Sequence, residues 1–198
     1  MNIRQQFGKP TGLLGHLVGY VLTLNNRERS EWVIAQLDLK PSDRVLEIGF
    51  GPGADIQRAS RTAAFVAGID HSDVMVRQAS SRNSAAIRDG RVELKLGTAS
   101  DLPYPDSLFD CVFAINSAQF WKPLPNALAE IKRVLKPGGR VLLAIQPRNK
   151  GATDETTRQV GFTMAKAFAA AGFEDANVDF KAMTPVSTAA IQARKPVS

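Results

Sequence analysis

The sequence has a single cysteine, Cys111, and only two histidines, His16 and His71. One cysteine excludes an internal disulfide, and Cys111 lies in an apolar run where a small buried thiol is expected. The histidines are far apart in the sequence and nothing has the spacing of a zinc site, so we predict no bound metal. This composition is typical of a reducing compartment.

Long apolar runs are also missing, since none approaches the roughly 18 apolar residues that a membrane-spanning helix needs. The start, Met1-Asn2-Ile3-Arg4, is followed by polar residues and not by the apolar core of a secretion signal. We therefore expect a cytoplasmic protein. Residues 12–24 are apolar and lie between Lys9 and Arg27, so contact with a membrane surface stays open as an alternative.

No block of like charge is present. The 25 lysine and arginine residues exceed the 19 acidic residues, for a net charge of +6, but they are scattered along the chain. A nucleic-acid-binding protein usually gathers its basic residues into a patch, so we expect no nucleic-acid partner. The net positive charge alone keeps RNA open as an alternative.

Short apolar runs alternate with polar or helical stretches in the middle of the chain. The runs lie at 45–48, 65–69, 92–96, 111–115 and 141–145, with helices expected near 54–63, 73–88 and 124–135. This alternation predicts parallel strands joined by right-handed crossovers. Lys136-Pro137-Gly138-Gly139 is expected to end the last of these helices and to turn the chain into the next strand.

A helix is expected near 155–171, followed by strands near 173–181 and 187–194. Two late strands after such a series predict a mixed sheet with an antiparallel edge. Because no repeat or long linker is present, we predict one α/β domain over 1–198. It would consist of a helical arm or lid at 1–40 and a doubly wound, Rossmann-like core at 43–198.

A glycine-rich turn, Gly49-Phe50-Gly51-Pro52-Gly53, directly follows the first predicted strand, where missing side chains let a ligand approach the backbone. The spacing of Gly49, Gly51 and Ala54 also fits a dinucleotide fingerprint, so a hydride-transfer enzyme is an alternative. Glu47 argues against it, because a carboxylate repels a pyrophosphate but attracts the sulfonium and ammonium of S-adenosylmethionine. Glu47 can instead pair with Arg44 or a helix terminus.

Asp70 ends the second predicted strand, at the carboxyl edge where open α/β sheets bind ligands. A carboxylate there can accept hydrogen bonds from both hydroxyls of a ribose. The alternative is a cap for the helix that follows, although Ser72 or Asp73 can fill that place. The separation of Asp70 from the glycine turn, about 20 residues, favours ribose binding.

Four segments in order resemble the class I S-adenosylmethionine-dependent methyltransferases, most closely their small-molecule branch, which includes the quinone-biosynthesis C-methyltransferases. These segments are Glu47-Ile48-Gly49-Phe50-Gly51-Pro52-Gly53, Gly68-Ile69-Asp70-His71-Ser72, Leu102-Pro103-Tyr104-Pro105-Asp106-Ser107-Leu108-Phe109-Asp110 and Leu135-Lys136-Pro137-Gly138-Gly139. The resemblance covers about 43–146. It implies a seven-stranded sheet with an antiparallel last strand and helices on both faces.

The resemblance also implies roles for particular residues. Gly49, Gly51 and Gly53 would line the methionine moiety, with Asn116 and Ser117 beside it. Asp70 would hold the ribose. His71 would flank the adenine, and the amide of Ala99 would meet an adenine nitrogen. Many relatives have an aspartate where this chain has Thr98. A threonine hydroxyl can still accept a hydrogen bond from the adenine amino group, and Asp101 is an alternative acceptor.

The methyl acceptor is expected to be a small, apolar or aromatic organic molecule. Gln119, Phe120 and Trp121 follow the fourth strand and can wall its pocket, although core packing is the alternative for the two aromatic residues. His16 and Tyr20 share a helical face and are candidates for a general base, or they merely pack among leucines. Methylation of RNA, protein or membrane lipid, and cofactor binding without turnover, remain rival functions.

Overall fold

The computed structural model describes residues 27–197. Its seven strands form a sheet in the order β3-β2-β1-β4-β5-β7-β6. The chain divides into two compact units, residues 1–98 and 99–198. Within residues 27–197, no helix has both the length and the apolar character required to cross a membrane.

The first unit is a parallel three-stranded arrangement with four described helices. Its elements are α3 (Arg27–Gln36), β1 (Arg44–Ile48), α4 (Ala54–Ala59), β2 (Phe65–Asp70), α5 (Asp73–Arg82), α6 (Ser84–Arg88) and β3 (Val92–Leu96). Strand β2 pairs in parallel with both β1 and β3, so their carboxyl ends share one edge. The apolar runs of β1 and β2 are almost wholly buried, which is why their sequences read as continuous hydrophobic strands.

The helix predicted over 73–88 is divided in two at Asn83. Its side-chain amide donates hydrogen bonds to the carbonyls of Ala79, at 2.9 Å, and Gly53, at 3.0 Å. Asparagine competes well with helical backbone hydrogen bonds, and here it ends α5 and ties it to the glycine turn. Ser72 caps the start of α5, since its side chain accepts from the amide of Met75.

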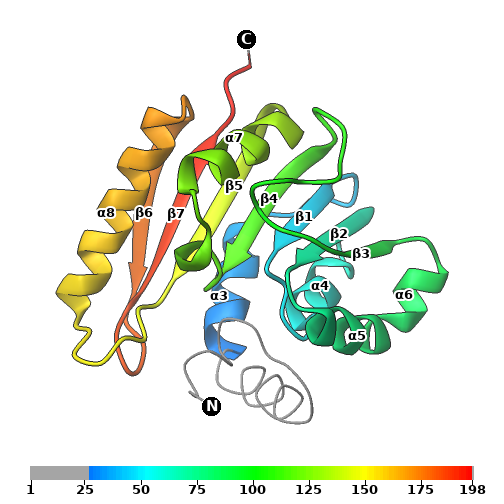
Figure 1. The fold of residues 1–198 in the computed structure, drawn as a ribbon, viewed down its shortest axis with the longest axis horizontal. Helices are drawn as coiled ribbons and strands as arrows, with labels where there is room; N and C mark the ends of the chain where they lie inside the picture. The colour runs from blue at the N-terminus through cyan, green and yellow to red at the C-terminus, as the bar shows by residue number, and fades with distance from the viewer. Residues whose placement is uncertain (1–26, 198) are drawn as a thin grey trace. The chain divides into compact units, whose positions relative to one another are not determined.

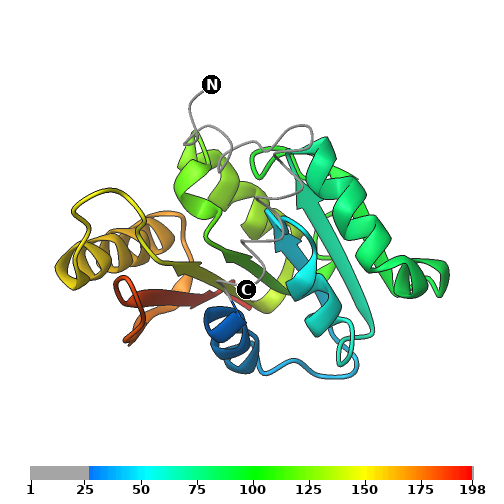
Figure 2. The same ribbon diagram turned by 90° about the horizontal axis from the view of Figure 1, so that it is seen from below.

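The second unit contains the mixed part of the sheet. Its elements are β4 (Phe109–Ile115), the 3-10 turn η1 (Ala118–Phe120), α7 (Leu124–Val134), β5 (Leu135–Ile145), α8 (Asp154–Ala170), β6 (Glu174–Lys181) and β7 (Thr188–Arg194). Strands β4 and β5 are parallel, whereas β7 is antiparallel to both β5 and β6. The prediction of a seven-stranded mixed sheet with an antiparallel last strand is confirmed. Helix α8 lies along β6 and β7 (Figures 1 and 2).

The prediction for Lys136–Gly139 was wrong in one respect, because this segment belongs to strand β5 and is not a separate turn. Helix α7 already ends at Val134, and the strand begins at the next residue. The register jumps from Phe109↔Leu135 to Cys111↔Arg140, so the proline and glycines are accommodated as a bulge. The segment also pairs with the residue that follows β7. The backbone amide of Gly138 donates to the carbonyl of Lys195, and the backbone amide of Lys195 donates to the carbonyl of Gly139.

Candidate cofactor site

The turn after β1 has a backbone that strongly favours glycine. The φ angles of Gly49, Gly51 and Gly53 are 78°, 51° and 75°, in the left-handed region that other residues rarely adopt. The amide of Gly49 donates to the carbonyl of Ile69 in β2, at 2.7 Å, which holds the turn against the neighbouring strand. Gly53 is the N-cap residue of α4.

Two of these glycines have different surroundings. A Cβ atom at Gly53 would lie 2.6 Å from Cβ of Ala79 and 2.8 Å from Nδ2 of Asn83, so this glycine allows α4 and α5 to pack closely. A Cβ atom at Gly51 would have no heavy atom within 4 Å among the described residues. The backbone at Gly51 therefore faces open space, where a ligand can approach it.

Asp70 links the glycine turn to the end of β2. Its Oδ2 accepts from the amide of Gly51 at 2.8 Å, and its Oδ1 accepts from the amide of Ser72 at 2.9 Å. The residue is 5% exposed, and burial raises its pKa, although the amides of Ser72 and Gly51 oppose this effect. Each carboxylate oxygen keeps a further lone pair, so Asp70 can accept ribose hydroxyls while it holds the turn.

Residues around Asp70 extend this edge of the first unit. His71 is partly exposed, with Nδ1 3.7 Å from Oδ1 of Asp70. Thr98, two residues beyond β3, is exposed. Sequence reasoning missed Leu96, which pairs in register with Asp70 and is 58% exposed. The sequence indicated only that Leu96 is the last residue of a predicted strand. A leucine at such a position is equally compatible with burial in the core.

Glu47 is buried, with 2% of its surface exposed, and its Oε2 has no hydrogen-bond partner among the described residues. Burial raises its pKa well above the ordinary value, and the nearby carboxylates of Asp55 and Asp70 raise it further. Arg58 and a backbone hydrogen bond from Ile56, in the first turn of α4, act in the opposite direction. The structure thus places Glu47 at a helix terminus, one of the alternatives open from the sequence.

Sequence reasoning also missed Asp55. Its carboxylate accepts from Nη1 of Arg58 at 2.8 Å and from the hydroxyl of Ser30 in α3 at 3.0 Å. Its pKa is raised because the group is largely buried. Three carboxylates thus lie under or beside the glycine turn with Arg58 as a close cation, and this local excess of acidic groups suits a cationic ligand.

We predict that Glu47→Gln changes how stability depends on pH. Because the folded pKa is raised, the native state retains a proton that the unfolded chain has already released. The contribution of Glu47 to the free energy of unfolding is therefore greatest below its unfolded pKa of about 4.5 and falls as pH rises toward the folded pKa. Glutamine cannot titrate. The free energy of unfolding of the variant should therefore rise relative to that of wild type by up to about 1.4 kcal/mol for each pH unit in that window.

Urea unfolding at a series of pH values measures this difference. Glu93→Gln is the matched control, because Glu93 lies on β3 of the same sheet and is half-exposed beside Lys95, at 3.0 Å. The control variant is unfolded over the same series of pH values. Parallel wild-type and Glu47→Gln curves would contradict the assignment of the shift to Glu47.

In the second unit, Asn116 directly follows β4 and has a left-handed φ of 53°. Its Oδ1 accepts from the amide of Gln146 at 2.7 Å, and its amide donates to Ala144 at 2.8 Å, so it joins the ends of β4 and β5. Asparagine tolerates this conformation better than most residues. Ala99 is buried, and its predicted contact with adenine stays a prediction.

The aromatic residues after β4 are placed differently from one another. Phe120 is 51% exposed, so the alternative that it packs in the core is wrong. Trp121 is half-buried, and Gln119 is exposed and donates to the carbonyl of Asn116 at 3.1 Å. The exposed ring of Phe120 is available to contact a ligand.

Several predictions fall on residues 1–26, which lie outside the described residues. These are the general-base candidates His16 and Tyr20, membrane contact through 12–24, and the arm or lid at 1–40 apart from the part that contains α3. Within residues 27–197, no group of three or more histidine, cysteine, aspartate or glutamate residues is arranged to hold a metal ion.

Comparison with known proteins identifies the class. Residues 46–143 match the methyltransferase domain family. The chain is 34% identical to the uncharacterized methyltransferase YdaC of Bacillus subtilis, over 92% of this chain and 99% of that protein. It is 36% identical to the demethylmenaquinone methyltransferase of Symbiobacterium thermophilum over 55% of this chain, which is 45% of that relative. Phosphoethanolamine N-methyltransferase 2 of Haemonchus contortus, solved with S-adenosyl-L-methionine, shares the fold, with a TM-score of 0.70, 18% identity, and coverage of 85% of this chain and 52% of that chain.

The chain belongs to the class I methyltransferase family, and it is an S-adenosylmethionine-dependent enzyme. The chain spans nearly the whole length of the Bacillus relative but about half the length of the Symbiobacterium demethylmenaquinone methyltransferase. The first unit fits the cofactor on its own geometry: open space at Gly51, a carboxylate at Asp70 with accepting capacity left, and a buried oxygen of Glu47 without a partner. The hydride-transfer alternative is thereby set aside.

Proposed function

We propose that the enzyme transfers the methyl group of S-adenosylmethionine to a small organic acceptor with an apolar or aromatic body. The observation that carries this proposal is the exposed ring of Phe120, which follows β4 and is 51% exposed. An exposed aromatic side chain at such a place is suited to covering a flat or apolar molecule and excluding water from it. The name of the Symbiobacterium relative, a demethylmenaquinone methyltransferase, supports an acceptor of this kind.

The cofactor contacts form part of this proposal. Asp70 accepts hydrogen bonds from the ribose, and the turn at Gly49, Gly51 and Gly53 receives the methionine moiety. A cation bound beside Glu47 favours the ionised form of this buried carboxyl group, whose pKa is otherwise raised. His71, Thr98, Ala99 and Asn116 complete the proposed set. Gly53 contributes through its backbone alone, because a side chain at this position would collide with Ala79.

The sulfonium supplies an already activated leaving group when the cofactor is bound. The remaining task of the protein is to align donor and acceptor and to exclude water, which can account for roughly 7–11 kcal/mol of the barrier. A rigid glycine turn anchored by Asp70 serves that alignment. If the acceptor must lose a proton, His16 and Tyr20 stay the candidates for the base.

A panel of acceptors with Phe120→Ala tests the proposal. We expect turnover with phenols or quinols, and we expect Phe120→Ala to raise KM about tenfold or more, since burying such a ring contributes roughly 1.5–3 kcal/mol. The affinity for S-adenosylmethionine should be unchanged. Isothermal titration calorimetry and initial-rate kinetics give the two quantities.

Phe162→Ala is the matched control, because Phe162 is a similarly exposed ring, at 54%, but lies on α8. It should not change KM. Turnover restricted to RNA, protein or lipid vesicles would replace the small-molecule assignment, and cofactor binding without turnover of any acceptor would favour a non-catalytic role.

A further inference from the structure

A groove of about 570 Å³ lies in the second unit between α7 and the C-terminal end of α8. Its apolar walls include Leu124, Leu128 and Ala129 on α7 and Ala167 and Ala170 on α8. On α7, Leu124 and Leu128 are four residues apart and share one helical face. The alanines have short side chains, which leaves space between the two helices. None of these residues belongs to the predicted cofactor or acceptor sets.

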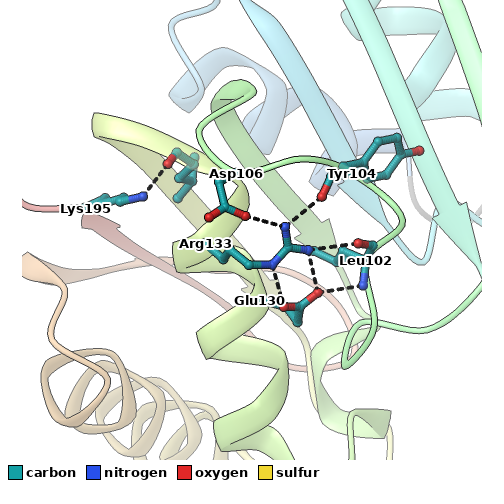
Figure 3. A network of polar contacts seen from close by, with 7 residues as sticks. Leu102, Tyr104, Asp106, Glu130, Arg133 and Lys195 are labelled. Carbon is teal, nitrogen blue, oxygen red and sulfur yellow. Dashed lines mark hydrogen bonds and ion pairs between the residues drawn. The ribbon is translucent and has the colours of Figure 1, made fainter.

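Two ammonium groups line the same groove. Nζ of Lys132 donates to the carbonyl of Ala171, the C-cap residue of α8, at 3.2 Å. Nζ of Lys195 donates to the carbonyl of Leu135, the C-cap residue of α7, at 2.7 Å (Figure 3). Because a carbonyl carries no formal charge, these hydrogen bonds do not supply a counter-ion to either lysine. An ammonium group has three donors, so each lysine also has donors left for a ligand. Neither lysine forms an ion pair within residues 27–197.

Arg133 lines the groove as well, but its charge is compensated (Figure 3). Its Nε donates to Glu130 at 2.7 Å and its Nη1 donates to Asp106 at 2.8 Å. The carbonyls of Tyr104 and Leu102 accept from the same guanidinium at 2.7 and 2.9 Å. The uncompensated positive charge of the groove therefore comes from Lys132 and Lys195.

We propose that this groove binds an organic anion with an apolar body, in the manner of a medium-chain carboxylate. The anionic group would take the spare donors of Lys132 and Lys195, and the apolar body would lie against Leu124 and the alanines. The volume falls within the roughly 300–1,000 Å³ typical of small-molecule sites. A site of this size favours a single small molecule over a peptide helix.

Calorimetry with decanoate below its critical micelle concentration, decan-1-ol below its solubility limit, and acetate tests the site. We expect decanoate to bind at least tenfold more tightly than decanol, and acetate to show no saturable binding. The double variant Lys132→Gln, Lys195→Gln should lose at least tenfold in decanoate affinity and keep its weak affinity for decanol. Lys166→Gln removes an exposed charge from α8 outside the groove and should change nothing.

Because the lysines also cap two helices, a second variant separates binding from stability. Ala129 is exposed, so Ala129→Trp should fill the groove without disturbing the core, and it should abolish decanoate binding while S-adenosylmethionine still binds. Equal affinity for decanoate and decanol, an equal loss in Lys166→Gln, or unchanged binding in Ala129→Trp would overturn the proposal. Conversion of a dimer to a monomer by Ala129→Trp, seen by sedimentation, would instead assign the groove to self-association.

Discussion

Asp70→Ala should weaken S-adenosylmethionine binding by about 100-fold or more. The two hydrogen bonds proposed between the ribose hydroxyls and the Asp70 carboxylate would contribute roughly 1.5–3 kcal/mol each, and every 1.4 kcal/mol is about tenfold in affinity. The variant also loses the acceptors of the Gly51 and Ser72 amides, which releases the glycine turn from the end of β2. Calorimetric titration of the cofactor, with thermal unfolding to confirm a folded protein, measures both effects.

The matched control is Asp73→Ala, which removes an exposed carboxylate from the first turn of α5, where it pairs with Arg77 at 2.8 Å. It should bind the cofactor like wild type. An analogue of S-adenosylhomocysteine that lacks the ribose hydroxyls adds a direct test. Compared with S-adenosylhomocysteine itself, it should bind wild type more weakly but bind Asp70→Ala with almost the same affinity. Equal sensitivity of both proteins to the missing hydroxyls would show that Asp70 acts only by holding the turn.

Gly53→Ala is expected mainly to lower the stability of the protein, whereas Gly51→Ala is expected mainly to weaken cofactor binding. Both residues have a positive φ, so each substitution costs about 1–2 kcal/mol of backbone strain. At Gly53 the new Cβ would also lie 2.6 Å from Cβ of Ala79, and such overpacking adds about 1–3 kcal/mol. At Gly51 the Cβ enters open space, so the main loss should be in cofactor binding, by about tenfold or more.

Chemical denaturation and cofactor titration of the two variants separate these effects. Gly53→Ala should have much the lower free energy of unfolding, and Gly51→Ala should have the greater loss of affinity relative to its loss of stability. If Gly51→Ala bound S-adenosylmethionine like wild type, the open space beside this glycine would not be part of the cofactor site.

The sequence by itself determined the class of the fold and the edge at which the proposed cofactor residues lie. Strands of a parallel sheet end at one edge, so a glycine turn after one strand and Asp70 at the end of the next had to come together. It also determined that Cys111 is buried, because it lies within an apolar run. These features depend on spacing along a single segment, which local patterns report well.

The tertiary structure alone decided what surrounds each residue. Gly51 and Gly53 look alike in the sequence, but only Gly53 meets α5, whose residues lie far along the chain. Glu47 reads as a strand-end charge, yet it is buried beside Asp55 and Asp70, and that burial raises its pKa. The groove between α7 and α8 is invisible in either helix alone. Burial, close approach and electrostatic coupling depend on contacts between distant segments, and no local pattern contains them.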